Sequence, residues 1–221
     1  YSKALEFDSK HAEAQKNLIH ILTHFTPLKK NFNPIIIANN SLQKKKKFFI
    51  LTEDTKKIDI ATLFKDSNKI IQDNIKELTF FETQIYRRNS IDLNCKRHHK
   101  AFNDLNVIPK FCFNCFKIQI EPKNVFELFK LFLIFDELKL SKNNTRKCLV
   151  ELRPNISGIY KGLIYCAGME EAEKILKDIT PTLKKLIDNN IMIKIKRGCS
   201  EFAEKYKDYK EINKDKLNFI K

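Results

Sequence analysis

The stretch CFNCFKIQIEPKNVFELFKLFLIFDELKL, residues 112–140, changes from an alternating pattern to a helical one at Pro122. Before that proline, apolar residues alternate with polar ones, which is the pattern of a half-buried strand, at Phe116, Ile118 and Ile120. After it, residues 125–138 have the apolar content of a helix that faces a core. The stretch therefore predicts a strand followed by a helix.

The residues that follow repeat this order. Strands are expected at 148–153, 160–166 and 191–196, with a turn at Gly158 and a second helix that begins at Gly168. The order strand-helix-strand-strand-helix-strand is that of the ferredoxin-like arrangement. Each strand-helix-strand unit returns parallel by a right-handed crossover, so the first two strands run one way and the last two the other. The usual spatial order of this fold is four, one, three, two, and we expect it here. The sequence thus predicts the α+β class, with a ferredoxin-like antiparallel sheet domain.

The N-terminal residues show small and apolar side chains at helical spacing. The motifs Tyr1-x-x-Ala4-Leu5-x-x-Asp8 and Ala12-Glu13-Ala14-x-x-Asn17-Leu18 resemble a tetratricopeptide repeat (TPR), as the end of one repeat and the first helix of the next. The resemblance stops after Thr26-Pro27, and three positions depart from the family pattern, namely Ser9, Gln15 and Ile19. It implies that a protein or peptide partner binds to a concave surface formed mostly by repeats upstream of Tyr1, with residues 12–24 as a capping helix.

The residues between this tail and the sheet are expected to be mostly helical. Asn33-Pro34 has the form of a helix start, and residues 60–78 and 94–105 carry the helical period. Lys44–Lys47 is expected to be a solvated linker before a short strand at Phe48–Leu51. The sequence therefore predicts terminal TPR-like helices, a helical connecting region, a cysteine-rich domain and a polar C-terminal tail, at residues 1–26, 27–93, 94–205 and 206–221.

The chain is strongly basic, but its composition does not favour a nucleic-acid partner. It has 42 Lys and Arg residues against 27 Asp and Glu, and a formal net charge of +15. Lys far outnumbers Arg, as an AT-rich coding sequence would produce, and only Tyr165 is suited to stacking bases on the central strands. With four Gly in the whole chain, a glycine-rich phosphate loop is not expected. No apolar run approaches the roughly 20 residues that cross a bilayer, so no membrane association is expected.

All six cysteines lie between Cys95 and Cys199, and two of them form Cys112-x-x-Cys115. Their strand-like surroundings favour thiolates in a reducing cytoplasm over disulfides. On the expected sheet, five cysteines fall at one end, in the row Cys199, Cys112 with Cys115, Cys166 and Cys148. The row spans roughly 14 Å at about 4.8 Å per strand. Because thiolates bind zinc at about 2.3 Å, one ion cannot collect the whole row.

The expected metal site combines cysteines of adjacent strands with one residue of a preceding helical turn. Its candidate ligands are Cys95, His98, His99, Cys112, Cys115 and Cys199. Zinc is the expected ion, and an iron-sulfur cluster that also recruits Cys148 and Cys166 is the alternative. Two further interpretations remain open: free cysteines that pack as small apolar side chains, and a redox-active dithiol.

Two classes of function remain open at this point. The first is a protein-binding or scaffold protein with a zinc-stabilised, cysteine-rich domain. The second is a metal- or thiol-dependent enzyme that acts on a partner recruited by upstream repeats. Residues 94–201 are similar to an uncharacterised cysteine-rich region that follows repeat arrays in bacterial proteins, a resemblance that implies no activity. A structural zinc is closed by four protein ligands, whereas a catalytic zinc keeps one position open.

Overall fold

The chain is an α+β protein that divides into two compact units, Tyr1–Thr83 and Gln84–Lys221. The structure is a computed structural model that describes residues 1–27, 32–79, 84–87 and 93–210. Within the described ranges, no helix is both long enough and apolar enough to cross a membrane.

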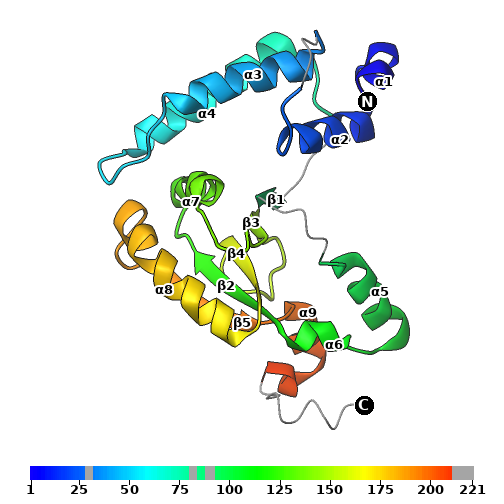
Figure 1. Cartoon of the computed structure of the whole chain (residues 1–221), viewed down its shortest axis with the longest axis vertical. Coiled ribbons are helices and arrows are strands. Elements are labelled where there is room, and N and C mark those ends of the chain that lie inside the picture. Colours follow the sequence, from blue (N-terminus) through cyan, green and yellow to red (C-terminus); the bar gives the residue numbers. More distant parts are fainter. Residues whose placement is uncertain (28–31, 80–83, 88–92, 211–221) are drawn as a thin grey trace. The chain divides into compact units, whose positions relative to one another are not determined.

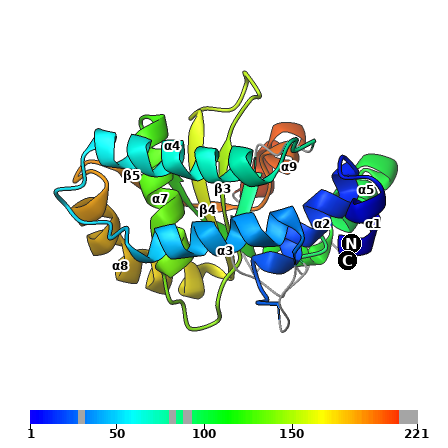
Figure 2. The same cartoon turned by 90° about the horizontal axis from the view of Figure 1, so that it is seen from above.

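The described residues of the first unit form four helices that pack in chain order, each against the next (Figure 1). They are α1 (Ser2–Phe7), α2 (Ala12–Leu22), α3 (Pro34–Lys47) and α4 (Lys57–Asn74). Figure 2 shows α3 and α4 lying side by side along their length. One apolar cluster of the unit joins α1, α2 and the start of α3, and consists of Leu5, Ala14, Leu18, Leu22, Ile35 and Ile36. Ala38, Ile60 and Leu63 are also buried, on α3 and α4.

The helix starts of the first unit follow from side-chain caps. The Asn33 side chain accepts a hydrogen bond from the Ile35 amide at 3.0 Å, and Pro34 occupies the first turn of α3, as the sequence predicts. At α4, the Asp59 carboxylate accepts from the Lys56 amide at 2.7 Å. These bonds satisfy amides that would otherwise lack a partner at the helix N-termini.

The segment from Lys44 to Leu51 differs from the expectation. Lys44–Lys47 forms the last turn of α3, where positive charge favours the helix dipole. Lys45 Nζ also pairs with the Asp66 carboxylate of α4 at 2.5 Å. The expected strand at Phe48–Leu51 is wrong, because these residues form the connection between α3 and α4, with Phe48 87% exposed.

Gln15, one of the three positions that depart from the repeat pattern of the resemblance, has a structural role of its own. The side chain is completely buried, and its Nε2 donates to the carbonyls of Ser9 at 2.7 Å and Glu77 at 2.9 Å. Its Oε1 accepts from the Thr79 amide at 3.0 Å. The amide therefore fastens the segment after α4 onto α2, a role that an aromatic ring could not perform.

The second unit is built on a five-stranded antiparallel sheet in the order β1-β3-β4-β2-β5. Its strands are β1 (Gln84–Arg87), β2 (Cys115–Glu121), β3 (Arg146–Val150), β4 (Tyr160–Ala167) and β5 (Met192–Arg197). Its helices are α5 (Cys95–Leu105), α6 (Lys110–Phe113), α7 (Val125–Glu137), α8 (Met169–Leu186), α9 (Ser200–Lys205) and the 3₁₀ turn η1 (Lys207–Lys210). The four expected strands occupy the expected order, and β1 is an additional edge strand where a helical region was expected.

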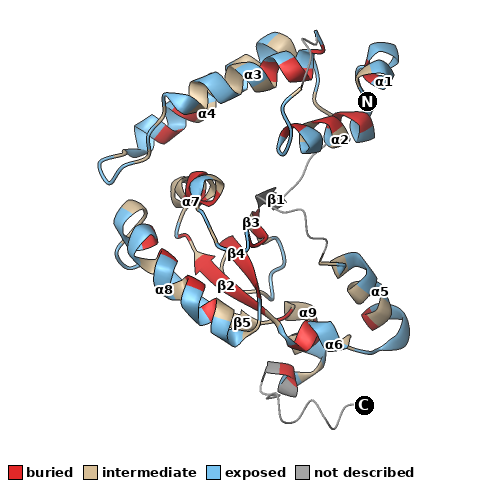
Figure 3. Cartoon of the chain, in the orientation of Figure 1, coloured by how far each residue is buried: buried red, intermediate tan, exposed pale blue. Residues whose placement is uncertain are grey.

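The central strands β2, β3 and β4 are largely buried on both faces (Figure 3). One face packs against α7 and α8, which lie along the same side of the sheet in Figure 1, and it carries the fully buried Ile118, Ile120 and Ile164. Gly162 lets α7 approach closely, because a Cβ there would lie 2.4 Å from a Leu131 methyl carbon. The opposite face is polar, yet its Lys117 is 6% exposed and its Gln119 is 4% exposed. The alternating pattern of β2 therefore predicted correctly which residues share a face. It was wrong in predicting that the polar face is exposed to solvent.

The residues after α9 correct the expected polar tail. Tyr209 in η1 is completely buried and packs with Phe113 and Phe202. The Tyr206 hydroxyl donates to the Asn106 carbonyl at 3.0 Å. Residues 206–210 therefore belong to the packed unit, and the rest of the expected tail, residues 211–221, lies outside the described residues.

Candidate metal centre

Three segments far apart in the sequence meet around one small cavity in the second unit. They are the start of α5, the turn from α6 into β2, and the turn from β5 into α9. The lining residues are Leu93, Cys95, His98, His99, Phe111, Cys112, Cys115, Tyr165, Gly198, Cys199 and Phe202. All six metal ligands proposed from the sequence are among them. The cavity has a volume of ≈ 10 Å³, which is enough for about one water molecule or ion.

The turn from α6 into β2 places two cysteines on the cavity. Cys112 is buried in the single turn of α6, and Cys115 is the first residue of β2. The Gly198 amide donates to the Cys115 carbonyl at 2.7 Å, which ties this turn to the end of β5. Gly198 has a φ of +55°, a conformation that suits glycine. Cys199 follows it directly and caps α9.

Tyr209 holds the underside of the same turn. Its hydroxyl donates to the Cys112 carbonyl at 2.8 Å, and burial raises the pKa of the phenol above its ordinary value. The ring leaves no space for a side chain at Gly198, where a Cβ would lie 1.7 Å from the Tyr209 oxygen. The residue after β5 must therefore be glycine for Tyr209 to reach Cys112.

The first turn of α5 supplies the remaining candidates. Cys95 is the first residue of this helix, and the His98 amide donates to the Asn94 carbonyl at 2.9 Å. Aromatic side chains fix the two imidazole rings. The His98 ring lies 5.4 Å from that of Phe111, and the His99 ring lies 5.4 Å from that of Phe202.

Within the described part of the chain, one group of three potential ligand side chains has all its ligand atoms within 4.8 Å of one another: His99, Cys199 and Glu201. Four thiolates at 2.3 Å from a zinc ion would be about 3.8 Å apart, so this spacing is close to that of a coordination shell. Glu201 was not predicted as a ligand. Its carboxylate also pairs with Arg153. The sequence feature that could have identified Glu201 is its position two residues after Cys199.

Burial, together with the neighbouring cysteines, raises the pKa values of two thiols at the cavity. Burial, with Cys199, Cys115 and Cys95 nearby, raises the pKa of Cys112 to about 12. Burial raises the pKa of Cys115 to about 11, although Lys117 acts in the opposite direction. Such thiols are protonated near neutral pH and are weak nucleophiles. A cation in the cavity would lower these pKa values, because it stabilises the thiolate form.

Lys117 is the positive charge nearest to the cysteines. Its Nζ lies 3.5 Å from Cys199 Sγ and 5.1 Å from the centre of the Tyr165 ring. The lysine side chain is almost completely buried on the polar face of the sheet. It is placed to offset negative charge on a thiolate cluster.

Cys148 and Cys166 do not line the cavity, and the expected row of five cysteines is wrong for Cys148. Because β3 begins at Arg146, Cys148 lies in the middle of the strand, opposite Gly162. Cys166 lies opposite Phe116 on the same, helix-covered face. Both are buried and pack as small apolar side chains, as the sequence analysis allowed.

Comparison of the chain with models of known protein families, with curated protein sequences and with solved structures finds no match.

Proposed function

We propose that the second unit is a zinc-stabilised domain in which Cys95, Cys112, Cys115 and Cys199 bind one ion. The observation that carries the proposal is the cavity of about one-ion size, lined by all four cysteines from three separate segments. Cys95 and Cys199 both lie near enough to raise the pKa of Cys112 and of Cys115. Four thiolates around zinc form a common structural site. The sulfurs of these four cysteines do not all lie within 4.8 Å of one another in this structure, so binding of the ion would draw them together.

The composition of the site favours a structural ion over a catalytic one. Four cysteine thiolates close the tetrahedral shell of a structural zinc, whereas a catalytic zinc keeps one position open for water or substrate. The four cysteines line a cavity of ≈ 10 Å³, together with the apolar side chains of Leu93, Phe111 and Phe202. A domain whose fold depends on metal is therefore better supported than an enzyme whose reaction takes place on the ion.

The order of the sheet supports assignment of the second unit to the ferredoxin-like class. The four strands β2 to β5 lie in the order β3-β4-β2-β5, and α7 and α8 form the two crossovers. In this assignment the zinc site fastens α5, α6 and α9 to one end of the sheet.

For the first unit we infer a protein-binding role of the TPR type. Its support is the packing of each helix against the next and the motif of residues 1–18. Among its described residues, the unit also exposes four phenyl rings that a protein partner would cover, those of Phe7, Phe25, Phe32 and Phe48. The whole chain would then be a scaffold in which a metal-held domain accompanies a binding module.

The zinc proposal is tested by the effect of a chelator on thermal unfolding of the full chain. Removal of the ion should lower the unfolding temperature of one transition and leave the other unchanged, because only the second unit holds metal. Cys112→Ser and Cys199→Ser should abolish the chelator effect. Cys166→Ser is the matched control, since it removes a buried thiol outside the cavity. An identical unfolding profile with and without chelator would contradict the proposal.

The fourth ligand is tested by cobalt substitution. Cys95→Ser should weaken the sulfur-to-cobalt absorption, whereas His99→Asn should leave it unchanged. The opposite result would replace Cys95 by His99, the imidazole that lies within 4.8 Å of Cys199 and Glu201.

A further inference from the structure

A second, much larger cleft lies beside the metal centre and extends along β5. It has a volume of ≈ 590 Å³, which is within the range of about 300–1,000 Å³ for small-molecule sites. Strand β5 forms one wall, and the connection between β3 and β4 together with α9 forms the other. Cys199 borders both cavities, so the metal centre holds one end of the cleft in place.

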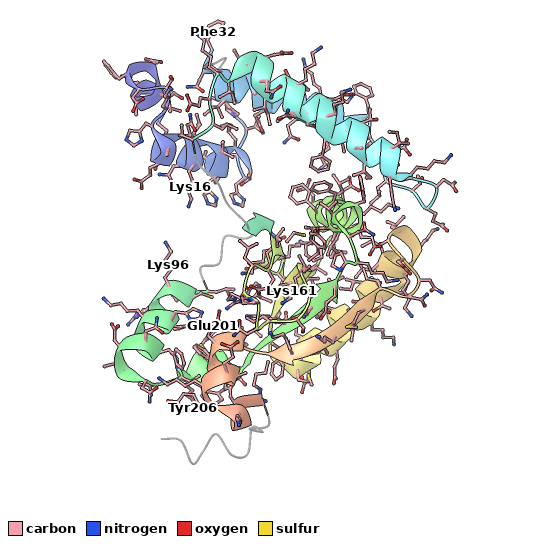
Figure 4. All side chains as sticks on the ribbon, turned by 180° about the vertical axis from the view of Figure 1, so that it is seen from behind. Lys16, Phe32, Lys96, Lys161, Glu201 and Tyr206 are labelled. Atoms are coloured by element: carbon pink, nitrogen blue, oxygen red, sulfur yellow. The ribbon has the colours of Figure 1, made fainter. Side chains whose placement is uncertain are left out.

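The side chains that line the cleft carry more positive than negative charge, although carboxylates outside the lining, Glu121 and Glu151, pair with Lys194 and Lys161. Four cationic side chains line it, and the single lining carboxylate is that of Glu204; the cations are Lys161, Lys194, Lys196 and Arg197. Figure 4 labels Lys161 on β4. Because Lys161 is only 4% exposed, its charge is poorly screened by water.

The lysines are held in place rather than free to move. Lys194 Nζ pairs with the Glu121 carboxylate at 2.6 Å, and Lys161 Nζ lies 3.5 Å from the Glu151 carboxylate. Lys196 Nζ bonds the Ser200 hydroxyl at 2.9 Å. These contacts hold the ammonium groups of Lys194 and Lys196 on β5, and that of Lys161 on β4, so that little further entropy is lost on binding.

The remaining lining combines neutral polar groups with apolar surface. Polar side chains suited to oxygen-rich ligands are those of Gln119, Asn155, Ser157 and Ser200. Apolar contact is offered by Phe116, Ile156, Met169, Ile195 and Ala203. A ligand that matches this lining has an anionic group at one part and an organic body at another.

We infer that this cleft binds a phosphorylated small molecule of about nucleotide size. Phosphate groups would bind the ammonium groups of Lys194 and Lys196, which act as point charges for such oxygens. The organic body would cover the apolar lining. The inference does not depend on which metal occupies the neighbouring site, because its charged groups belong to strands β4 and β5.

Calorimetric titration of the full, metal-loaded chain tests the inference, with ATP, AMP and inorganic pyrophosphate as probes. We expect at least one nucleotide to bind with a dissociation constant below the millimolar range and more tightly than pyrophosphate. Lys194→Gln with Lys196→Gln should weaken that binding about tenfold or more. The matched control is Lys174→Gln with Lys177→Gln, which removes the same charge from exposed positions of α8.

A second variant guards against a folding defect in the lysine variant. Ser157→Phe places a bulky ring in the cleft from an exposed loop position without changing the charge, and it should also weaken nucleotide binding about tenfold. Absence of binding by the unaltered chain, or an equal loss in the α8 control, would overturn the inference. Tighter binding of pyrophosphate than of either nucleotide would overturn the assignment of the apolar lining.

Discussion

Replacement of Gly198 by Ala should destabilise the second unit far more than its small size suggests. The φ of +55° costs a residue with a Cβ about 1–2 kcal/mol. The new Cβ would also lie 1.7 Å from the Tyr209 oxygen and 2.5 Å from Cζ, so the ring must move. Its hydroxyl would then lose the buried bond to the Cys112 carbonyl, at a cost of about 1–3 kcal/mol. The free energy of unfolding should fall by about 2–5 kcal/mol.

The structure offers a second glycine, Gly168, at which a Cβ causes backbone strain without a collision. Its φ is +117° and its ψ is 166°, a region that is essentially confined to glycine, and a Cβ there would have no atom within 4 Å. Gly168→Ala therefore measures strain alone, whereas the contribution of Tyr209 is isolated by making Gly198→Ala alone and together with Tyr209→Phe. Denaturant unfolding of the full chain, followed by far-UV circular dichroism, measures both values.

Tyr209→Phe completes the experiment. This variant should cost about 1–3 kcal/mol by itself, because it removes the same hydrogen bond. In combination with Gly198→Ala the two costs should not add, since both remove one interaction. If the costs of Gly198→Ala and Tyr209→Phe add fully in the double variant, Tyr209 does not hold the metal-site turn.

Three further predictions concern the core and the cysteines. Gly162→Ala should lower the free energy of unfolding by about 1–3 kcal/mol in denaturant titrations, because the new Cβ would lie 2.4 Å from a Leu131 carbon. An unchanged unfolding midpoint would contradict the close packing of α7 on β4. Cys166→Ala should leave the bound zinc unchanged in elemental analysis, whereas Cys112→Ala should remove it; equal zinc contents would sink the ligand assignment. The apparent zinc affinity should rise with pH, because the pKa values of Cys112 and Cys115 are about 12 and 11 and both thiols must lose a proton to bind. Calorimetry in buffers of different ionisation enthalpy measures the protons released, and zero release near neutral pH would contradict thiolate ligation.

The strand order was predictable because it depends on local features and a general rule. The period of two in residues 115–121, the turn at Gly158 and the right-handed crossover leave few possible orders for the four strands. The edge strand β1 was not predictable, because a four-residue strand is defined by its pairing with β3 rather than by its own pattern. Phe48–Leu51 shows the converse, since an apolar run without a partner strand remained a connection.

The cysteines that line the candidate site were predictable from the sequence, but the contacts that hold them in place were not. Cysteine positions relative to the strands were enough to bring Cys112, Cys115 and Cys199 together. Cys148 was misplaced because periodicity does not fix where a strand begins, and β3 starts two residues before this cysteine. The Tyr209 contact with Cys112 joins residues 97 positions apart, and no local pattern specifies such a contact.

The most direct test of the proposed metal centre is the metal and thiol content of the full chain, purified without oxygen. We predict about one zinc ion per chain, with Cys95, Cys112, Cys115 and Cys199 protected from thiol reagents until a chelator is added. Detection of iron together with inorganic sulfide would mean that the site holds an iron-sulfur cluster instead of zinc. A folded, metal-free protein in which these four thiols react at once would contradict the central claim.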